Sequence, residues 1–488
     1  MKILMVSPEC APFSKVGGLA DMVSSLSKEL AERGHDVRIL TPFYSCVKVR
    51  GGFEPALPFM GVRMGCGIEE FCSVWRAPLG GASAYFLEFN RYYDRPGIYN
   101  DGASSYPDNG GRFAFLCKAA IDFCQASAWI PDVIHCHDWT SGFVPMYLNT
   151  THRHAPVGRA ATVFTIHNMQ HQGIFPPDLL NYAGLPASEV FRPDNCEALG
   201  NVNMMKGAIY NSTKVSTVSP TYAREIRTPG FGCGLDWLMR FKAADTVGIV
   251  NGIDYSEWNP ATDSLIPANY SASDMSGKAA CKAALQARMG LSADPSVPVF
   301  GVVSRLYDQK GLDLLAAIVS PLMDNMKIQI ALLGSGEPWL QDAFSRLASS
   351  YPGRMGVHIG YDNALSHLIE AGSDFFVMPS RFEPCGLNQL YSMAYGTPPV
   401  ARSTGGLADT ISQYDEKTGA GDGFLFSDAT TSALYNTLGW ACSTYYDRPG
   451  DLARMRLSGM SRDFSWKRSA AEYSDLYGWA VAARSPQK

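Results

Sequence analysis

The sequence predicts an α/β protein of two doubly wound domains, each built on a parallel β-sheet. The chain has 488 residues, more than a single hydrophobic core usually supports, so two domains are expected. Short apolar segments typical of buried strands alternate with amphipathic segments typical of helices, which is the pattern of βαβ units. This alternation starts a second time near residue 247, which favours two sheets over one very large sheet.

The first βαβ unit occupies the N-terminus. Residues 2–6 (KILMV) predict a buried strand, residues 19–33 an amphipathic helix, and residues 37–40 (VRIL) the next strand. A glycine-containing loop joins the first strand to the helix. Such a unit places its two strands parallel, with a right-handed crossover between them. The same rhythm recurs at residues 131–135, 161–167 and 215–218.

The second series predicts a domain over residues 248–465, after a first domain over residues 1–247. We expect the hinge near residues 248–254 and a polar excursion from the core at about 261–277. The helical sequence at about 466–488 is a candidate for packing back on the first domain. The strands predicted in the second domain are residues 299–304, 328–333 and 375–379, with a helix starting at Gly311.

Composition excludes several classes of protein. A formal net charge of −5 argues against a nucleic-acid-binding protein. No apolar run approaches the roughly 20 residues that span a bilayer, and the N-terminal apolar run is too short for a signal peptide, so we expect no membrane partner. The 12 cysteines lack a CxxC pair, which favours reduced thiols. We therefore expect a cytoplasmic protein, or one of a plastid or other soluble compartment if a targeting segment has been removed.

A glycine-rich loop follows the first predicted strand. It contains Lys15, Gly17, Gly18 and Asp21 and leads into the first predicted helix. Ligands of doubly wound sheets gather at the carboxyl ends of strands, where glycines let backbone N–H groups approach an anion closely. The loop is neither a GxGxxG nor a P-loop motif, which disfavours dinucleotide or P-loop chemistry. A tight turn with a solvated lysine is the alternative.

Two predicted strands of the first domain end in histidines. His135 and His137 alternate with Cys136 and Asp138, so the two histidines share one face of the strand. These residue types bind zinc, but at most two of them project the same way and no second ligand cluster follows, which disfavours a metal site. Buried, hydrogen-bonded histidines are the alternative. His167 follows the strand ending at residue 166, again at a carboxyl end.

Two cations follow the strand predicted at residues 299–304. Arg305 ends this strand, and Lys310 lies five residues later, just before the next predicted helix. Cations beside a helix N-terminus suit a diphosphate, and donors held there lower the barrier of a reaction in which a diphosphate leaves. A surface cluster of ion pairs is the alternative interpretation.

A carboxylate follows the strand predicted at residues 375–379. Glu383 lies in the loop between this strand and a helix predicted from about Leu387, whose N-terminal amides would offer a second anion site. A lone glutamate before a proline is otherwise an ordinary loop carboxylate. Tyr361 follows another apolar segment, and an ordinary half-buried tyrosine is its simplest interpretation.

These segments together resemble a known family. Residues 15–19 (KVGGL) are similar to the K-x-G-G-L motif of bacterial glycogen synthases and plant starch synthases. One motif is weak evidence, but the likeness continues across nearly the whole chain, in the family's order. The further segments are residues 135–139 (HCHDW), His167 with Asn168, Arg305 with Lys310, residues 383–387 (EPCGL) and residues 403–407 (STGGL).

The resemblance implies a fold and a reaction. The family has two Rossmann-like domains, the GT-B architecture, with the active site in the cleft between them. It implies a retaining hexosyltransferase that moves glucose from ADP-glucose to the non-reducing end of an α-1,4-glucan or maltooligosaccharide. ADP-glucose is then a substrate, and no metal or other cofactor is expected.

The resemblance also implies roles for single residues. Glu383 lies beside the donor sugar and stabilises positive charge at its anomeric carbon, Arg305 and Lys310 clamp the diphosphate, and His167 hydrogen-bonds near the glucose 6-hydroxyl. Asp138 completes the catalytic set. Tyr361 stacks on the nucleobase. The implied substrate-binding residues are Lys15, Gly17, Gly18, Asp21, Trp139, Asn168, Tyr361, Cys385, Gly386, Leu387 and Asn388.

Two segments depart from the family pattern. Residues 169–173 (MQHQG) lack the acidic residue that the family often carries there, and Asn388 stands where the family often carries a hydroxyl residue. These departures concern one sugar contact and one phosphate contact.

Rival functions remain open. A retaining glycosidase would need two carboxylates about 5 Å apart, whereas only Glu383 stands out in the donor pocket. The resemblance instead implies attack of the acceptor hydroxyl on the face that the diphosphate leaves. Another retaining GT-B enzyme with a small sugar acceptor is one alternative. A catalytically inactive glucan-binding protein is the other, and it is disfavoured because the implied catalytic residues are all present.

Overall fold

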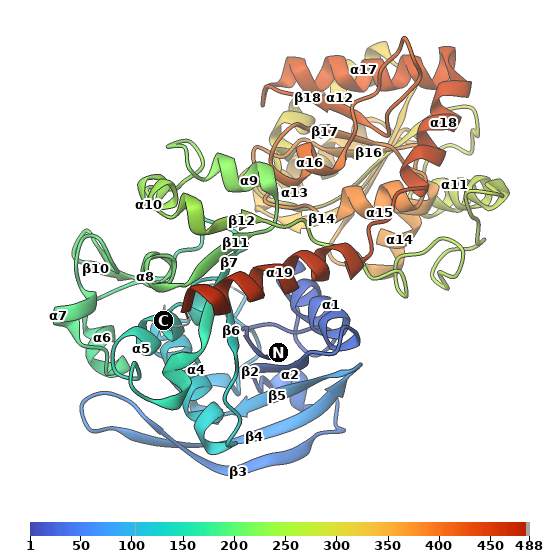
Figure 1. The fold of residues 1–488 in the computed structure, drawn as a ribbon. Helices are drawn as coiled ribbons and strands as arrows, with labels where there is room; N and C mark the ends of the chain where they lie inside the picture. The colour runs from blue at the N-terminus through green and yellow to red at the C-terminus, as the bar shows by residue number, and fades with distance from the viewer. Residues whose placement is uncertain (103, 485–488) are drawn as a thin grey trace. The chain divides into compact units, whose positions relative to one another are not determined.

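The computed structural model, which describes residues 1–102 and 104–484, divides into two compact units (Figure 1). Unit 1 comprises residues 1–252 and the C-terminal helix α19 (Trp466–Arg484), and unit 2 comprises residues 253–465. Each unit contains a doubly wound sheet, which is parallel throughout in unit 2 and parallel in unit 1 except for β4 and β3 at one edge. The predicted fold class is therefore confirmed.

Unit 1 is built on a nine-stranded sheet in the order β12-β11-β7-β6-β1-β2-β5-β4-β3. Neighbours from β12 to β5 pair parallel, whereas β4 pairs antiparallel with both β5 and β3. Chain order reverses beside β1, since β2 lies on one side of it and β6 on the other. The strands are β1 (Lys2–Val6), β2 (Asp36–Pro42), β3 (Glu54–Arg63), β4 (Glu69–Leu79), β5 (Ala82–Glu88), β6 (Val133–His137), β7 (Ala161–Ile166), β11 (Lys214–Thr217) and β12 (Thr246–Gly248).

The helices of unit 1 cover this sheet. The longer ones are α1 (Gly18–Glu32), α4 (Asn109–Ala126) and α19, and shorter ones fill the connections: α2 (Ser45–Lys48), α3 (Asn90–Tyr93), α5 (Phe143–Asn149), α6 (Asp178–Ala183), α7 (Ala187–Val190), α8 (Met204–Asn211), α9 (Pro220–Glu225) and α10 (Asp236–Phe241). A small antiparallel sheet joins β8 (Ile174–Phe175), β10 (Asn201–Asn203) and β9 (Glu197–Ala198).

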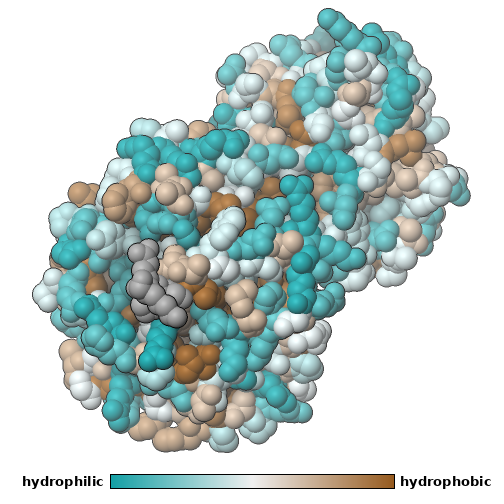
Figure 2. Space-filling model, viewed as in Figure 1, coloured by the Kyte–Doolittle hydropathy of each residue, from teal (hydrophilic) through white to brown (hydrophobic). Residues whose placement is uncertain are grey.

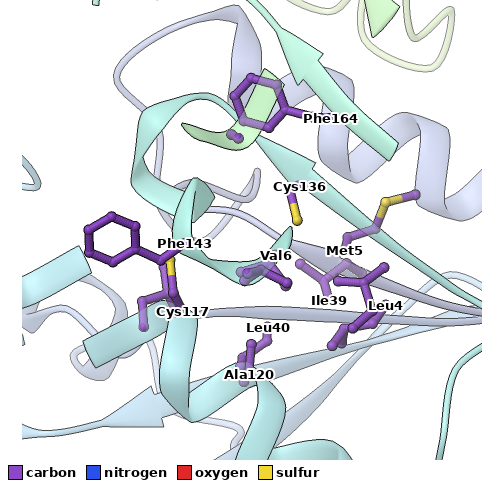
Figure 3. Close-up of a cluster of buried hydrophobic side chains, with 14 of the residues drawn as sticks. Leu4, Met5, Val6, Ile39, Leu40, Cys117, Ala120, Cys136, Phe143 and Phe164 are labelled. Carbon is purple, nitrogen blue, oxygen red and sulfur yellow. The ribbon is translucent and has the colours of Figure 1, made fainter. Parts of the chain in front are cut away.

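The core of unit 1 lies on both faces of its sheet. Leu4, Val6, Ile39 and Leu40 of the central strands pack in one hydrophobic cluster with Cys117 and Ala120 of α4 and Phe143 of α5 (Figure 3). Continuous apolar strands of this kind are buried on both sides, which is the rule for parallel sheets. The central strands are therefore held firmly, and the loops at their carboxyl ends start from a rigid base.

Helix α19 packs on unit 1. Its Trp466, Tyr473 and Tyr477 are buried in the unit 1 core, and its Ser474 hydrogen-bonds the His35 ring at 3.2 Å. This helix lies in the segment at about 466–488 that is the candidate for packing back on the first domain. Residues 485–488 lie outside the described part of the chain.

Two predictions for unit 1 need correction. The segment near residue 247 does not start the second series: it is β12, which pairs parallel with β11 and ends the first sheet. A strand of three residues carries too little pattern to indicate which sheet it joins. The antiparallel strands β3 and β4 were not predicted either, because β3 is an edge strand with interrupted alternation and two irregular steps in its pairing with β4.

Unit 2 has a six-stranded parallel sheet in the order β15-β14-β13-β16-β17-β18. Numbered within the unit this is 3-2-1-4-5-6, the doubly wound order, which reverses between β13 and β16. The strands are β13 (Val299–Leu306), β14 (Gln329–Gly336), β15 (Met355–Ile359), β16 (Phe375–Met378), β17 (Pro399–Arg402) and β18 (Phe424–Phe426).

Eight helices of unit 2, counted in the part that the structure describes, cover the two faces of this sheet. They are α11 (Ser276–Arg288), α12 (Leu312–Asn325), α13 (Pro338–Ser350), α14 (Asn363–Gly372), α15 (Asn388–Ala394), α16 (Gly405–Thr410), α17 (Thr431–Asp447) and α18 (Pro449–Met460). Alternation along β13 sends Phe300 and Val302 into the cluster with α12 and α17, and Val299 into the cluster with α11 and α14.

The predicted polar excursion at residues 261–277 is wrong in part. Within it, Asp263, Ile266 and Tyr270 are buried, and the Asp263 carboxylate accepts hydrogen bonds from the His367 ring at 2.7 Å and the Tyr395 hydroxyl at 2.6 Å. Anchors spaced irregularly along an extended segment leave no periodic signal.

The surface carries apolar residues in small separate groups on the face that Figure 2 shows. Over the described residues, no helix combines the length and the apolar character needed to cross a bilayer. The twelve cysteines, all among the described residues, are thiols and form no disulfide.

Candidate active site

The predicted site residues follow strands at or near the reversal of chain order in each unit. In unit 1 they follow β1, β6 and β7, and in unit 2 they follow β13, β16 and β17, except for Tyr361, which follows β15. This edge is where doubly wound sheets bind ligands. We call the first group the unit 1 site, comprising Glu9, Lys15, His137, Asp138 and His167. The unit 2 site comprises Arg305, Lys310, Glu383 and the glycines 386, 405 and 406.

A buried glutamate holds the glycine-rich loop of unit 1. Glu9, 3% exposed, accepts hydrogen bonds from the N–H groups of Val16 at 2.5 Å and Gly17 at 3.1 Å, and its other oxygen accepts from the Tyr99 hydroxyl at 2.6 Å. Burial raises the pKa of Glu9, while these hydrogen bonds oppose the rise. The Gly17 N–H, expected to approach a ligand, is instead bonded to a carboxylate of the chain. The sequence analysis missed Glu9, since the three contacts join segments separated by 7, 8 and 90 positions.

Lys15 and Asp21 lie at the start of α1. The Lys15 ammonium is 2.8 Å from the Asp21 carboxylate, and both side chains are partly exposed. Gly17 is the N-cap of α1, and no side chain caps this helix. The Ala20 N–H donates to the Gly17 carbonyl at 3.2 Å, so among the first-turn amides it is those of Gly18 and Leu19 that helix geometry leaves for an anion.

Asp138 ties the ends of β6 and β7 together. Its carboxylate accepts the backbone N–H of His167 at 2.8 Å, and a bond from the Asn168 N–H also lowers its pKa. Burial outweighs both bonds and raises the pKa of Asp138 to about 7. Asp138 has φ +53°, a conformation unusual outside glycine. The residue predicted as catalytic therefore holds the loop that carries His167 and Asn168.

Trp139 supports the same loop. Its ring lies 5.1 Å from Phe113 and 5.5 Å from Phe175 between centroids. It also packs so closely on Gly173 that a Cβ there would stand 2.4 Å from the ring. The Trp139 side chain, predicted to contact the sugar, thus packs against Phe113, Phe175 and Gly173.

Three histidines line up behind this loop. The rings of His135 and His137 are 4.1 Å apart between centroids, which confirms that they share a face of β6. Both nitrogens of His135 are used, by the Tyr477 hydroxyl at 2.8 Å and the Thr165 hydroxyl at 2.6 Å, so this ring has none left for a metal. Within the described part of the chain no three His, Cys, Asp or Glu side chains are grouped to hold a metal ion.

His137 and His167 contact each other directly. Nδ1 of His137 lies 3.1 Å from Nε2 of His167. Burial lowers the pKa of His137 well below its ordinary value and that of His167 to about 3. The unit 1 site therefore presents a neutral histidine, held in place by Asp138 through its backbone and by His137 through its ring.

The unit 2 site centres on an ion pair. Glu383, 5% exposed, lies 2.5 Å from the Lys310 ammonium and accepts a hydrogen bond from the Ser380 hydroxyl at 3.0 Å. Arg305 is exposed, with its guanidinium 5.8 Å from the centre of the Tyr307 ring. The residues predicted from two separate strands thus meet at one edge, because β13 and β16 are neighbours in the sheet.

Glycines set the backbone around Glu383. A Cβ on Gly405 would stand 2.0 Å from the Glu383 carbonyl oxygen, and one on Gly406 would stand 2.0 Å from the Cys385 carbonyl oxygen. The Gly406 N–H also donates to the Glu383 carbonyl at 3.1 Å. Only glycine allows this approach. The STGGL segment, residues 403–407, therefore packs directly against the backbone of the Glu383 loop.

The remaining predicted residues of unit 2 surround this loop. Cys385 is buried, Gly386 has φ +73°, and Leu387 is the N-cap of the short helix α15. The Asn388 amide donates to the Val303 carbonyl at 3.0 Å, so it links α15 to β13. Tyr361 lies after β15 and is 86% exposed, so the interpretation as a half-buried tyrosine is wrong. An exposed ring has the free face that stacking on a base requires.

Comparison with known proteins covers the whole chain. Residues 2–241 match the family model of the starch synthase catalytic domain, and residues 288–443 match that of glycosyl transferases group 1. Glycogen synthase 1 of Geobacter metallireducens is 45% identical over 492 residues, covering 100% of this chain and 98% of that protein. Glycogen synthase of Treponema denticola is 41% identical over 492 residues, covering 99% of each.

A solved structure agrees with these matches. The catalytic domain of starch synthase IV from Arabidopsis thaliana, bound to ADP and acarbose, superposes with a TM-score of 0.91 at 34% identity, and the match covers 99% of each chain. Sucrose-phosphate synthase from Thermosynechococcus elongatus, at 18% identity and a TM-score of 0.60, shares the fold.

Proposed function

The chain belongs to the family of bacterial glycogen synthases and plant starch synthases, and from that premise we propose that it transfers glucose from ADP-glucose to the non-reducing end of an α-1,4-glucan. The anomeric configuration is retained. The observation that carries the proposal is the buried Glu383, paired with Lys310 at the carboxyl edge of β16 and β13. The relative that was solved with ADP and acarbose supports a nucleotide donor and a glucan-like acceptor.

We assign the diphosphate to the cations of the unit 2 site. Negative charge accumulates on the diphosphate as the bond to glucose breaks, and preorganised cations stabilise that charge. Arg305 is exposed at the end of β13, and Lys310 is held by Glu383. These two residues supply the positive charge that a divalent metal supplies in other transferases, so we propose that the reaction needs no metal. Gly386 and Leu387 contribute backbone amides, and Tyr361 offers its exposed ring to the nucleobase.

We assign the sugar to Glu383 and His167. As the anomeric carbon becomes electron-poor, a carboxylate fixed by Lys310 and Ser380 stabilises its positive charge. The neutral ring of His167 offers a hydrogen bond to a glucose hydroxyl without placing a charge there. Asp138 and Trp139 hold the loop that carries His167 and Asn168.

The bond changes balance without a covalent enzyme intermediate. The bond from the anomeric carbon to the diphosphate breaks, and its electron pair stays on the diphosphate. The acceptor hydroxyl forms the new bond on the same face, and its proton passes to a phosphate oxygen of the leaving group. Lys15 and the amides at the start of α1 are proposed substrate-binding groups of the unit 1 site.

We place the enzyme in the cytoplasm, or in a plastid or comparable compartment. The support is the cysteine chemistry: all twelve cysteines are thiols, as expected for a reducing compartment. The proposal names no nucleic acid or membrane partner.

A side-by-side assay tests the function. Radiolabelled ADP-glucose and UDP-glucose are offered with a maltooligosaccharide primer, with and without a chelator of divalent metals. We expect label in a glucan product, from which an α-1,4-specific amylase releases it. The rate of incorporation should be higher with ADP-glucose than with UDP-glucose and should not change with the chelator. Parallel reactions offer fructose 6-phosphate or glucose 6-phosphate as the acceptor. Label in a disaccharide phosphate there, and none in glucan, would contradict the proposed glucan acceptor. Binding of glucan without transfer would indicate an inactive binding protein.

A further inference from the structure

The strongest unassigned feature of the unit 1 site is His137. It is the last residue of β6, it is fully buried, and the proposed mechanism gives it no contact with a substrate. Its Nδ1 lies 3.1 Å from Nε2 of His167. We propose that His137 is a positioning residue, which fixes the neutral His167 ring in the form that carries its proton on Nδ1.

The first step of the argument is the charge of both rings. Burial lowers the pKa of His137 well below its ordinary value, and burial lowers that of His167 to about 3. Both rings are therefore neutral at physiological pH. A neutral imidazole has one donor nitrogen and one acceptor nitrogen. In the contact between Nδ1 of His137 and Nε2 of His167, one nitrogen must carry the proton and the other must accept it.

The second step decides the direction of this hydrogen bond. The other nitrogen of His137, Nε2, is buried and has no hydrogen-bond partner among residues 1–102 and 104–484. If Nε2 carried the proton, a buried N–H would be unpaired. If Nδ1 carries it, the unpaired atom is an acceptor, which folded proteins tolerate better than an unpaired donor. His137 therefore donates from Nδ1 to Nε2 of His167.

The third step fixes His167. Its Nε2 accepts this bond, so its proton must be on Nδ1. The neighbouring ring of His135 cannot take over the role of His137, because both of its nitrogens bond to Tyr477 and Thr165. The backbone of His167 is held separately by Asp138 at 2.8 Å. His167 thus offers an N–H donor from Nδ1, suited to a hydroxyl oxygen.

The next step rests on the proposed function. There the Nδ1–H group of His167 donates its hydrogen bond to a hydroxyl oxygen of the glucose in ADP-glucose. An N–H group of fixed direction suits a glucose hydroxyl oxygen whose own proton points away from the histidine ring. The alternative form of His167 would instead present a bare nitrogen, which would have to accept the sugar's proton. His137 therefore decides whether His167 donates to the sugar or accepts from it.

The test that does not depend on activity is ¹⁵N nuclear magnetic resonance of the wild-type protein with ring-labelled histidine. The protonated and bare nitrogens of a neutral ring have well separated shifts, and the chain has only nine histidines. Loss of signals in His167→Gln assigns the ring. We expect His167 with a protonated Nδ1 and a bare Nε2. A protonated Nε2 on His167 would overturn the inference, whatever any variant does.

Variants then test the consequence. His137→Asn keeps a donor near the position of Nδ1, and His137→Leu removes it. We expect kcat with ADP-glucose to fall roughly tenfold or more in His137→Leu, and to stay within about threefold of wild type in His137→Asn. The exposed His154→Leu is the matched control, with unchanged rate and unchanged His167 shifts.

A donor that lacks the 6-hydroxyl separates this inference from the proposed function. With ADP-6-deoxyglucose, His137→Leu and wild type should transfer sugar equally well if His167 bonds that hydroxyl. An equal loss with both donors, together with the expected ring form, supports the role of His137 and contradicts the proposed sugar contact. If His137→Leu does not fold, the wild-type spectrum alone decides.

Discussion

The unit 1 site and the unit 2 site lie at the same place in two sheets of similar strand order, yet they are built from different chemistry. In unit 1, a buried glutamate and a half-buried aspartate accept backbone N–H groups, and neutral histidines bond to each other. In unit 2, Lys310 and Glu383 form an ion pair, Arg305 is exposed, and glycines bring the backbone segments close together.

The difference indicates a division of work. Neutral hydrogen-bonding groups recognise hydroxyls by direction, and burial keeps the unit 1 histidines neutral. Fixed charges stabilise a group whose charge changes during the reaction, which suits a departing diphosphate. We therefore propose that the same fold position serves mainly positioning in unit 1, where Lys15 and Asp21 supply the charges, and charge stabilisation in unit 2. Substitutions in either site should therefore have different effects.

The largest effect is expected for Glu383→Gln. The variant keeps the size of the side chain and loses its charge beside the reacting carbon, so kcat should fall by about 10³-fold or more, while binding of ADP changes little. Steady-state rates and calorimetric titration with ADP measure the two effects. The exposed Glu416→Gln in the same unit is the control, with wild-type kcat. Near-normal turnover in Glu383→Gln would remove this residue from the mechanism.

Lys310→Ala should lower kcat by roughly 10²-fold. It removes a cation from the proposed diphosphate clamp and leaves the buried Glu383 without its partner at 2.5 Å. The rate with saturating ADP-glucose measures this, and the exposed Lys417→Ala serves as control. A change confined to the KM for the glucan would contradict the clamp assignment.

Gly406→Ala should act on the Glu383 loop through the backbone. The added Cβ would stand 2.0 Å from the Cys385 carbonyl oxygen, so the loop must move, at a cost of about 1–3 kcal/mol in the free energy of unfolding. We expect a lower midpoint of thermal unfolding and a reduced kcat. Gly450→Ala is the matched control, because its Cβ would meet nothing closer than 3.9 Å. Equal stability of the two variants would refute the close packing.

A further effect, which leaves the chemical step aside, concerns the pH dependence of stability through Asp138. Its pKa is about 7 in the folded protein, against the ordinary aspartate value of 3.8, so the folded state binds this proton more tightly than the unfolded chain does. Its contribution to the free energy of unfolding should therefore decrease as pH rises from about 4 to 7, by at most about 1.4 kcal/mol per pH unit. Urea unfolding of wild type and Asp138→Asn across this range measures it.

In Asp138→Asn this loss on raising the pH should be absent, whereas the exposed Asp178→Asn should keep it. A wild-type and an Asp138→Asn protein with parallel stability curves from pH 4 to 7 would mean that Asp138 is ionised throughout that range.

Much of the fold follows from local patterns. The strands β1, β7 and β13 begin and end close to their predicted positions, because each is a short apolar run bounded by a turn signal. The order of the motifs also placed the site residues after the correct strands. The predictions for the segment near residue 247 and for residues 261–277 were wrong, because a three-residue strand and an irregular buried segment have no hydrophobic period.

The sequence by itself determined which residues stand at the carboxyl ends of the strands: Lys15, Asp138, His167, Lys310 and Glu383. This information is local, because residue type and strand position are read from neighbours in the chain. Only the tertiary structure decided what each of these groups bonds to. The Glu9 carboxylate reaches Tyr99 across 90 positions, His137 reaches His167 across 30, and Lys310 reaches Glu383 across 73. Contacts of such separation form when parallel strands are brought side by side, and periodicity along one segment carries no record of them.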